Sequence, residues 1–329
     1  MEKKKRGFKI IRRVIIALIV IAIVATAITT NQLVKYAIGR DSSSGNRQVE
    51  ENSDDSVDTE KDTQSIHITE YNQGIAWMNK TNYDEMSITT DDNLKINGRL
   101  YNGNSANHRY VILVHGYHCS MEDMASYAKH YYENGYSVLM MDLRAHGDSE
   151  GKYIGMGWLD KDDLIKWVNT ITHKDTNSKI ILHGVSMGAA TVMMAGGESL
   201  PYNVKAIIED CGYTSAYDIF ESELQKRFPA IPVHPTMDLA SALSKAKAGY
   251  SFKEASAIKQ IKKCTTPTFF IHGTADDFVP CSMVDELYNA ATCQKDLYKA
   301  EGAGHARAKD VNPQEYFLKV FSFIDANIK

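Results

Sequence analysis

The sequence predicts an α/β domain in which helices cover both faces of a mostly parallel sheet. Short apolar runs such as YVILVH (110–115) and KIILH (179–183) recur along the chain. Amphipathic or small-residue segments of helical length separate them, for example 158–172. A buried parallel strand is expected to be apolar throughout, and strands that alternate with helices indicate a sheet covered on both faces.

The individual elements follow from the same patterns. Residues 86–90 and 94–101 flank Asp91-Asp92-Asn93, which predicts an antiparallel hairpin. The expected strands after it are 110–115, 137–143, 179–183, 204–209, 268–272 and 295–299. The expected helices are 121–133, 158–172, 187–197 and 313–327. Residues 214–258 are longer than a single crossover helix requires, so we interpret them as a helical cap over the strand ends.

The composition is that of an ordinary globular protein. The chain has 329 residues, of which 43% are hydrophobic and 24% charged, and its net charge is −4. This balance gives no sign of nucleic-acid binding. The five cysteines lack the close spacing of a metal site, so they are expected to be free thiols, with one disulfide as the alternative: Cys119, Cys211, Cys264, Cys281 and Cys293. The odd number leaves at least one thiol unpaired within the chain.

The N-terminal region predicts a membrane anchor. Residues 1–13 are basic and precede an apolar segment, 14–30, that is just long enough to span a bilayer. The positive-inside rule then leaves residues 1–13 in the cytoplasm and the rest of the chain outside. The alternative is a secreted protein whose signal peptide is cleaved near Ala25-Thr26-Ala27. Residues 31–65, acidic from about 41, are expected to form a flexible stalk before a domain at 66–329.

One motif carries the chemistry. Gly184-Val185-Ser186-Met187-Gly188 matches G-x-S-x-G, follows an apolar strand directly and opens an Ala-rich helix. This strand–turn–helix context is the one in which a strained turn exposes a nucleophilic serine. Ser186 is therefore the candidate nucleophile, and the idle serine of a tight turn is the alternative.

A serine nucleophile needs a base and an orienting acid. Where the serine lies in a G-x-S-x-G turn between a strand and a helix, the acid and then the histidine follow it along the chain. His305 lies in a Gly-rich loop after the last strand and is the candidate base, whereas His272 and His234 fit structural or pocket-lining roles better. Asp276 follows the strand 268–272 and is the candidate acid. Its neighbour Asp277 and the more distant Asp210 are the alternatives.

An oxyanion needs two backbone N–H donors. Met187 follows the nucleophile, and Tyr117 follows Gly116 in the loop after strand 110–115, so these two residues are the candidates. The run Arg144–Ser149 has histidine, aspartate and serine too close together for a triad and is interpreted as a structural turn. The sequence has no P-loop, GxGxxG or HExxH motif, so no cofactor and no metal is expected.

Together these motifs resemble the α/β-hydrolase superfamily. The segments HGY, DLRAHGDSEG, GVSMG, HGTADDFVP and GAGHA occur in the family's order and cover about residues 85–328. Within the superfamily, the chain looks similar to bacterial exported or cell-surface hydrolases of the prolyl-oligopeptidase-like and dienelactone-hydrolase-like branches. The resemblance implies the α/β-hydrolase fold, a Ser186-Asp276-His305 triad and an oxyanion hole at Tyr117 and Met187. Ala145 departs from the family, which commonly has glycine there.

The expected function is hydrolysis of acyl esters through an acyl-enzyme. A peptidase or amidase with the same triad is one alternative, and a surface-anchored binding protein that retains the fold without catalysis is another. A fold alone does not define a substrate.

Overall fold

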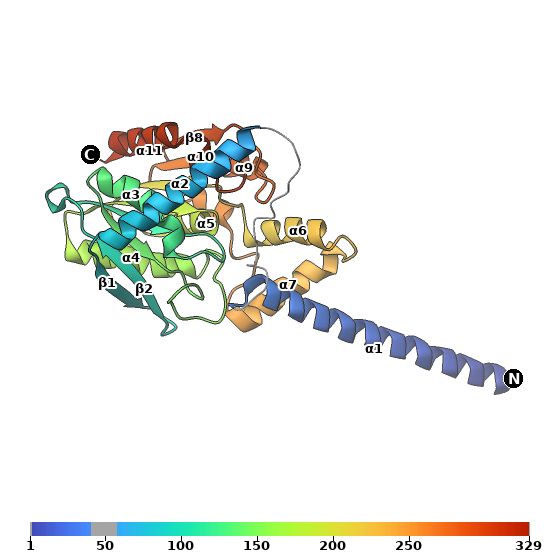
Figure 1. The fold of residues 1–329 in the computed structure, drawn as a ribbon. Helices are drawn as coiled ribbons and strands as arrows, with labels where there is room; N and C mark the ends of the chain where they lie inside the picture. Colours follow the sequence, from blue (N-terminus) through green and yellow to red (C-terminus); the bar gives the residue numbers. More distant parts are fainter. Residues whose placement is uncertain (1, 41–57, 329) are drawn as a thin grey trace.

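The computed structural model describes residues 2–40 and 58–328, and these residues form one eight-stranded sheet in the order β1-β2-β4-β3-β5-β6-β7-β8 (Figure 1). The strands are β1 (Asp84–Thr89), β2 (Lys95–Tyr101), β3 (Arg109–Val114), β4 (Ser137–Met141), β5 (Lys179–Val185), β6 (Val204–Asp210), β7 (Thr268–Gly273) and β8 (Lys295–Ala300). Strand β2 pairs antiparallel with both β1 and β4, and all other pairs are parallel. The predicted hairpin and the mostly parallel sheet are both confirmed.

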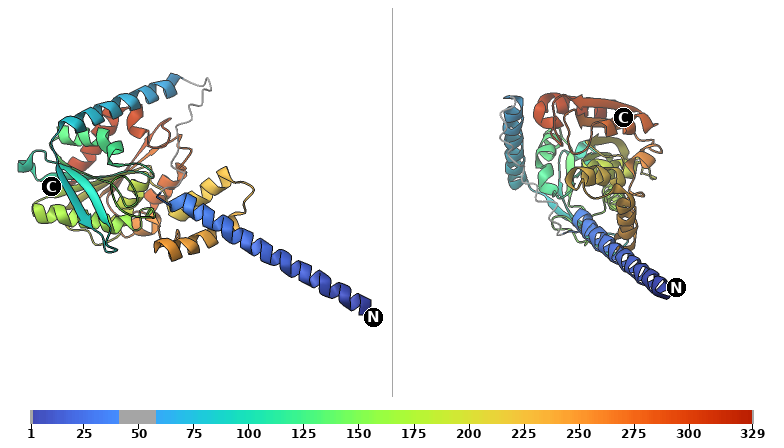
Figure 2. Two further views of the ribbon diagram at one scale, coloured as in Figure 1. Left: turned by 60° about the horizontal axis from the view of Figure 1, so that its bottom comes forward. Right: turned by 90° about the vertical axis from the view of Figure 1, so that its right-hand side faces the viewer.

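Helices cover the two faces of this sheet, as the alternating pattern predicts (Figure 2). On one face α4 (Asp160–Lys174), α5 (Met187–Gly196), α8 (Ala257–Ile261) and α9 (Ser282–Ala290) bury side chains such as Trp167, Val192 and Leu287 in one core. On the other face α3 (Ala125–Glu133) and α11 (Pro313–Asn327) bury Tyr131 and Tyr316 in a second core. The short elements η2 (Ser105–Asn107), η3 (Met121–Met124) and α10 (Ala308–Val311) connect these layers.

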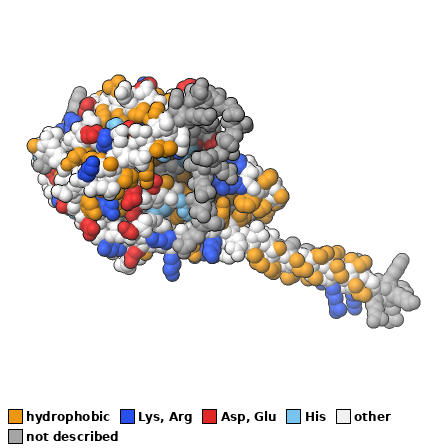
Figure 3. Space-filling model, viewed as in Figure 1, with side chains coloured by type: hydrophobic (Ala, Val, Ile, Leu, Met, Phe, Trp, Pro, Cys, Tyr) orange, Lys and Arg blue, Asp and Glu red, His pale blue; other side chains and the backbone are white. Residues whose placement is uncertain are grey.

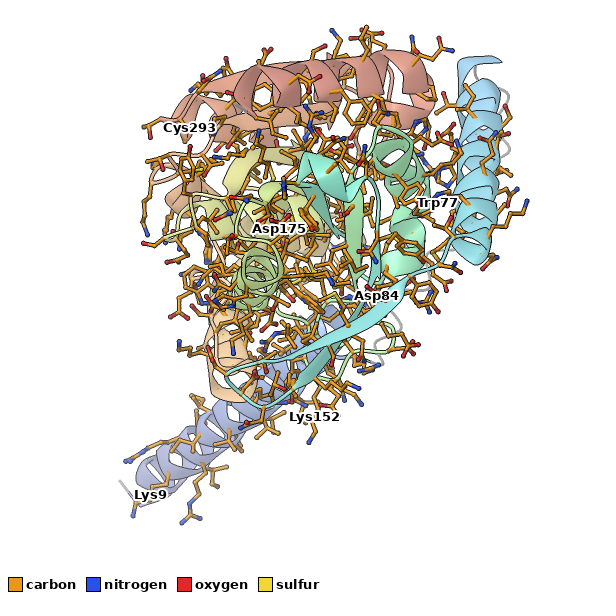
Figure 4. All side chains as sticks on the ribbon, turned by 90° about the vertical axis from the view of Figure 1, so that its left-hand side faces the viewer. Lys9, Trp77, Asp84, Lys152, Asp175 and Cys293 are labelled. Carbon is orange, nitrogen blue, oxygen red and sulfur yellow. The ribbon has the colours of Figure 1, made fainter. Side chains whose placement is uncertain are left out.

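Helix α2 (Asp58–Lys80) corrects the predicted extent of the stalk. It begins inside the segment that was expected to be flexible and lies along α3, where Glu70 accepts a hydrogen bond from His130 at 2.9 Å. The rings of Trp77 and Tyr101 lie with their centroids 4.8 Å apart, and Figure 4 labels Trp77 on this helix. The helix was not predicted because its sequence is mostly polar and acidic. Its few apolar side chains are nevertheless enough to pack it against the domain.

The predicted start of the stalk at residue 31 is also corrected, because helix α1 (Glu2–Ile38) continues past it. Its first part projects away from the domain, but residues 31–38 continue the helix and pack against the domain (Figures 1 and 2). The physical reason is that Val34 and Ile38 are apolar at helical spacing and become fully buried. Arg40 then fixes the chain by donating to the carbonyls of Ser149 and Gly147. Residues 41–57 lie outside the described residues, and with them most of the predicted stalk.

The projecting part of α1 is apolar on its surface. Large hydrophobic side chains between Ile10 and Ile28 are about half exposed, and Figure 3 shows them along the helix with basic side chains toward its far end. Within the described residues, no helix combines the length and the apolar character that crossing a membrane requires. The side chains of residues 19, 22 and 23, inside the predicted span 14–30, are not among those described.

The predicted cap region between β6 and β7 is helical. Helices α6 (Ala216–Arg227) and α7 (Val233–Ala248) occupy it, and α7 packs against the last turns of α1. Ile219 and Met237 are buried where the two cap helices meet the domain. The cap and the end of α1 therefore form one structure beside the carboxyl ends of the strands (Figure 2).

The docking of α1 can be tested by its effect on stability. Replacing Ile38, which is fully buried, with alanine should lower the free energy of unfolding by about 2–5 kcal/mol. Urea unfolding of the full chain in a mild detergent measures this change. Gln32→Ala, at an exposed position of the same helix, is the matched control. Equal stability of the two variants would contradict the packing of α1 on the domain.

Candidate active site

Ser186 occupies a strained turn between β5 and α5. Its backbone has φ 57° and ψ −115°, a positive-φ conformation that costs free energy for a residue with a side chain. The glycines on either side allow this turn, because a Cβ on Gly188 would lie 2.0 Å from the carbonyl oxygen of Val114. A Cβ on Gly184 would lie 2.1 Å from the carbonyl oxygen of Gly188. The close approach of strand and helix turns the serine outward at the carboxyl end of the sheet.

The structure brings Ser186, His305 and Asp276 together. The Nε2 atom of His305 lies 2.9 Å from Ser186 Oγ, and its Nδ1 atom lies 2.7 Å from Asp276 Oδ2. These distances fit a hydroxyl that donates to Nε2 and an imidazole that donates from Nδ1. The ring of Phe278 packs edge-on against the imidazole with centroids 4.9 Å apart. The three residues come from loops after β5, β7 and β8.

Asp276 is held as a carboxylate. Its Oδ1 accepts hydrogen bonds from the backbone N–H groups of Phe278 and Val279, both at 2.9 Å. Its Oδ2 also lies 3.3 Å from Nε2 of His272. Burial by itself raises the pKa of Asp276, but the hydrogen bonds and charges of His272 and His305 outweigh it and hold that pKa well below its ordinary value. The carboxylate can therefore stabilise a positive charge on His305.

The side chains of the alternative residues make other contacts, although the backbone carbonyl of Asp210 accepts a hydrogen bond from the Ser186 N–H at 2.8 Å. Asp277 is exposed, and Asp210 accepts a hydrogen bond from the hydroxyl of Tyr316 at 2.8 Å. His234 is on the cap surface, paired with Asp238 at 3.0 Å. Of the candidate acids, Asp276 is the one hydrogen-bonded to His305.

The loop after β3 lies against the serine, as a donor for an oxyanion must. A Cβ on Gly116 would be 3.5 Å from the Cβ of Ser186, and Tyr117 is the next residue. The loop is fixed by the N–H of His118, which donates to His146 Nε2 at 3.1 Å. Met187 is the first residue of α5, where the first helix N–H groups have no partner within the helix and favour negative charge.

The run Arg144–Ser149 forms a turn that supports this loop. Asp142, just before it, accepts hydrogen bonds from the backbone N–H of Met121 at 2.7 Å and of Asp148 at 3.0 Å. Ala145 has φ 61°, a conformation that glycine adopts at lower cost, which fits the glycine that the family resemblance leads one to expect at this position. None of these residues is hydrogen-bonded to Ser186 or His305 among the bonds described.

Two pockets meet at Ser186. The first is mostly apolar, is partly open to solvent, and runs between the cap helices and α1. Its lining includes Met156, Tyr213, Phe220 and Met237. The second is more polar, and it is lined by Ser186 and His305 together with His67, Asp123, Arg307 and Lys309. The serine therefore has an apolar side and a mixed side, where charged side chains lie among apolar ones.

Among the described residues, one group of three could place ligand atoms around a metal ion: Cys211, Asp276 and His305. Both ring nitrogens of His305 are already engaged with Ser186 and Asp276. Burial, and then the charge of Asp210, raises the pKa of the Cys211 thiol well above its ordinary value, so the thiolate that metals prefer is disfavoured. This group suits hydrogen bonding better than metal binding.

Comparisons with known proteins agree with this architecture. A family model described as serine aminopeptidase, S33, matches residues 105–217. The uncharacterised protein YqkD of Bacillus subtilis (strain 168) is 32% identical over 219 residues, which cover 65% of this chain and 70% of that protein. The chain belongs to the α/β-hydrolase superfamily.

Solved structures of other hydrolases share the fold. An esterase of Pyrococcus furiosus has 25% sequence identity and a TM-score of 0.61, and the match covers 76% of this chain and 92% of that one. An esterase of Exiguobacterium antarcticum, at 15% identity and a TM-score of 0.53, matches 74% of this chain and the whole of the other, and shows the fold alone. Esterases are thus among the structural neighbours of this hydrolase.

Two contributors to the hydrolase site were not predicted as such. His272 was assigned a structural role, and the structure places it behind Asp276, where Nε2 lies 2.9 Å from the carbonyl oxygen of Val279. Burial lowers its pKa, but its hydrogen bonds to Asp276 and Val279 outweigh this and raise it above the ordinary value. The end of α1 was assigned to the stalk, and it lines the apolar pocket. The apolar spacing of residues 33, 34, 37 and 38 is the signal that could have revealed it.

A buried carboxyl near the site predicts a pH dependence of stability. Desolvation raises the pKa of Glu209 to about 8, although its Oε2 accepts a hydrogen bond from Gly212 N–H at 3.0 Å. The folded protein then keeps this proton up to about pH 8, whereas the unfolded chain loses it near the ordinary value of 4.5. Unfolding releases a proton between these values, so the stability contributed by this group falls as the pH rises.

Glu209→Gln should therefore reduce the loss of stability between pH 5 and pH 8 by at least about 1 kcal/mol. Urea unfolding of both proteins at the two pH values measures the difference. Other buried carboxyls titrate in the same way in both proteins and cancel. An identical loss in the variant would show that Glu209 is ionised in the folded state.

Proposed function

We propose that this chain is a serine hydrolase that cleaves carboxylic esters through a covalent acyl-enzyme on Ser186. The observation that carries the proposal is the continuous hydrogen-bond path from Ser186 Oγ through His305 to Asp276, at 2.9 Å and 2.7 Å. An activated serine, a base within reach and an acid that orients the base are the parts that nucleophilic acyl transfer requires.

In the first half of the reaction, His305 Nε2 takes the Ser186 proton as Oγ attacks the ester carbonyl carbon. The carbonyl oxygen becomes an oxyanion, which the N–H groups of Tyr117 and Met187 stabilise by hydrogen bonds. The tetrahedral intermediate collapses when His305 returns its proton to the alcohol oxygen. The alcohol leaves, and the acyl group stays bonded to Oγ.

In the second half, water replaces the alcohol. His305 takes a proton from the water as its oxygen attacks the acyl carbon, and then gives that proton to Ser186 Oγ. The carboxylic acid leaves and the enzyme is restored. Asp276 remains ionised and stabilises the imidazolium in both halves, which is the role its low pKa suits.

A peptidase or amidase is the second candidate. The family model that matches residues 105–217 is described as serine aminopeptidase, and amide cleavage would use the same serine, base and acid. The esterase neighbour from Pyrococcus furiosus and the apolar pocket beside Ser186 favour ester cleavage. The narrower resemblance to exported prolyl-oligopeptidase-like and dienelactone-hydrolase-like enzymes stays a prediction.

We also propose that α1 attaches the hydrolase to the outer face of a cell membrane. Support comes from the exposed apolar side chains between Ile10 and Ile28 and from the basic residues that precede them. Cleavage after a signal peptide is the alternative, and it would release the domain with residues 31–40 still attached. N-terminal sequencing of the mature protein distinguishes the two.

The esterase proposal is tested by replacing the nucleophile. Ser186→Ala should lower kcat for p-nitrophenyl esters by about 10⁴-fold or more, because the covalent step is lost. The wild type should also be labelled by a fluorophosphonate and the variant should not. Ser199→Ala, at an exposed serine distant in sequence from His305 and Asp276, is the control.

The other results separate the alternatives. A wild type that is labelled but cleaves only peptide or amide substrates would favour the peptidase. A wild type that is neither labelled nor active would favour a binding protein that retains the fold.

A further inference from the structure

The last turns of α1 form one wall of the apolar pocket that opens at Ser186. Four residues of this helix line it: Leu33, Val34, Tyr36 and Ala37. The cap helices form the facing wall through residues such as Phe220 and Met237. The pocket is thus enclosed by two segments that are far apart in the sequence and that lie side by side in both views of Figure 2.

This wall is fixed on the side of the proposed oxyanion loop. The hydroxyl of Tyr117 donates a hydrogen bond to the carbonyl oxygen of Ala37 at 2.5 Å. The carbonyl of Ile38 accepts from the N–H of Ile154 at 2.8 Å, and the neighbouring Val34 is buried. Because Tyr117 belongs to the loop beside Ser186 and is also bonded to α1, the wall and the reacting serine keep a defined separation.

The wall is also tied to the cap. Arg227 of α6 lies 3.4 Å from the hydroxyl of Tyr36, and Lys247 of α7 donates a hydrogen bond to Asn31. The rings of Tyr36 and Phe228 meet edge to face with centroids 6.4 Å apart. A ligand between α1 and the cap would therefore contact two surfaces held together by polar bonds at the pocket rim.

The chemistry of the lining points to its occupant. Apart from Thr236 and the ion pair of Glu223 with Arg227, at 2.7 Å, the side chains beyond Ser186 are aliphatic, aromatic or thioether groups. The pocket on the other side of Ser186 carries Asp123, Arg307 and Lys309. An ester bound at Ser186 gains most by placing an apolar acyl chain against α1, where the lining is almost wholly apolar, and its alcohol in the second pocket, which also offers charged side chains.

We propose that the four residues of α1 that line the pocket, Leu33, Val34, Tyr36 and Ala37, are specificity-determining residues that select esters of medium or long apolar acyl chains. The proposal rests on the esterase function proposed above. It assigns to a segment next to the predicted membrane anchor a direct part in substrate recognition. A protein that begins at residue 66 would lack this wall, so its acyl-chain preference would differ from that of the full chain.

The test fills the pocket from α1. Ala37→Trp in the full chain, in a fixed mild detergent, should lower the octanoyl-to-acetyl ratio of kcat/KM for p-nitrophenyl esters by about tenfold, since a bulky ring displaces several methylene contacts. Gln32→Trp, exposed on the same helix and outside the pocket lining, should leave that ratio at the wild-type value. Leu33→Ala, which removes side-chain volume from the same wall and so enlarges the pocket, should move the acyl-chain preference toward longer chains.

Different results would overturn the esterase function and the role of the α1 wall. A wild type without fluorophosphonate labelling would overturn the esterase proposal itself. Normal labelling of all variants with an unchanged chain-length ratio in both Ala37→Trp and Leu33→Ala would overturn only the assignment of the wall. If Ala37→Trp does not fold, Leu33→Ala decides alone: a shift toward longer acyl chains supports the role of the wall, and an unchanged preference overturns it.

Discussion

The structure of the site depends on the close contact between the end of β5 and the start of α5. Ser186 adopts a positive-φ backbone conformation, and glycines at 184 and 188 leave room where a Cβ would collide with backbone at 2.1 Å and 2.0 Å. This contact projects the serine at the carboxyl edge of the sheet, where the loops after β7 and β8 also lie. His305 and Asp276 reach it from neighbouring loops, so one strained turn sets the position of the proposed chemistry.

The surroundings of that turn divide a substrate into two parts. Loops from the sheet and helix α2 supply a mixed pocket that contains charged side chains, while the cap and α1 supply an apolar one. The N-terminal helix thus has two proposed roles: its exposed apolar part would attach the chain to a membrane, and its buried end would shape the pocket. Because both lie on one continuous helix, the position of the active site relative to a membrane surface would be restricted.

Much of the fold and of the candidate site could be predicted from the sequence, for physical reasons that differ from element to element. Buried strands such as β3 and β5 are apolar throughout, and the glycines around Ser186 carry a local signal, so both were predicted with near-correct bounds. Helix α2 was not, because its apolar positions are few and lie among polar residues. The end of α1 was not either, although residues 33, 34, 37 and 38 have apolar helical spacing, because that segment is short. Their burial depends on surfaces formed by distant segments, which periodicity in one segment does not reveal.

The most direct test of the account is a crystal structure of the full chain reacted with an alkyl fluorophosphonate that carries an octyl group. The account predicts phosphorus bonded to Ser186 Oγ, the phosphoryl oxygen at the N–H groups of Tyr117 and Met187, and the octyl chain against Ala37. A chain directed instead toward Arg307, or a phosphonate attached to another residue, would contradict it.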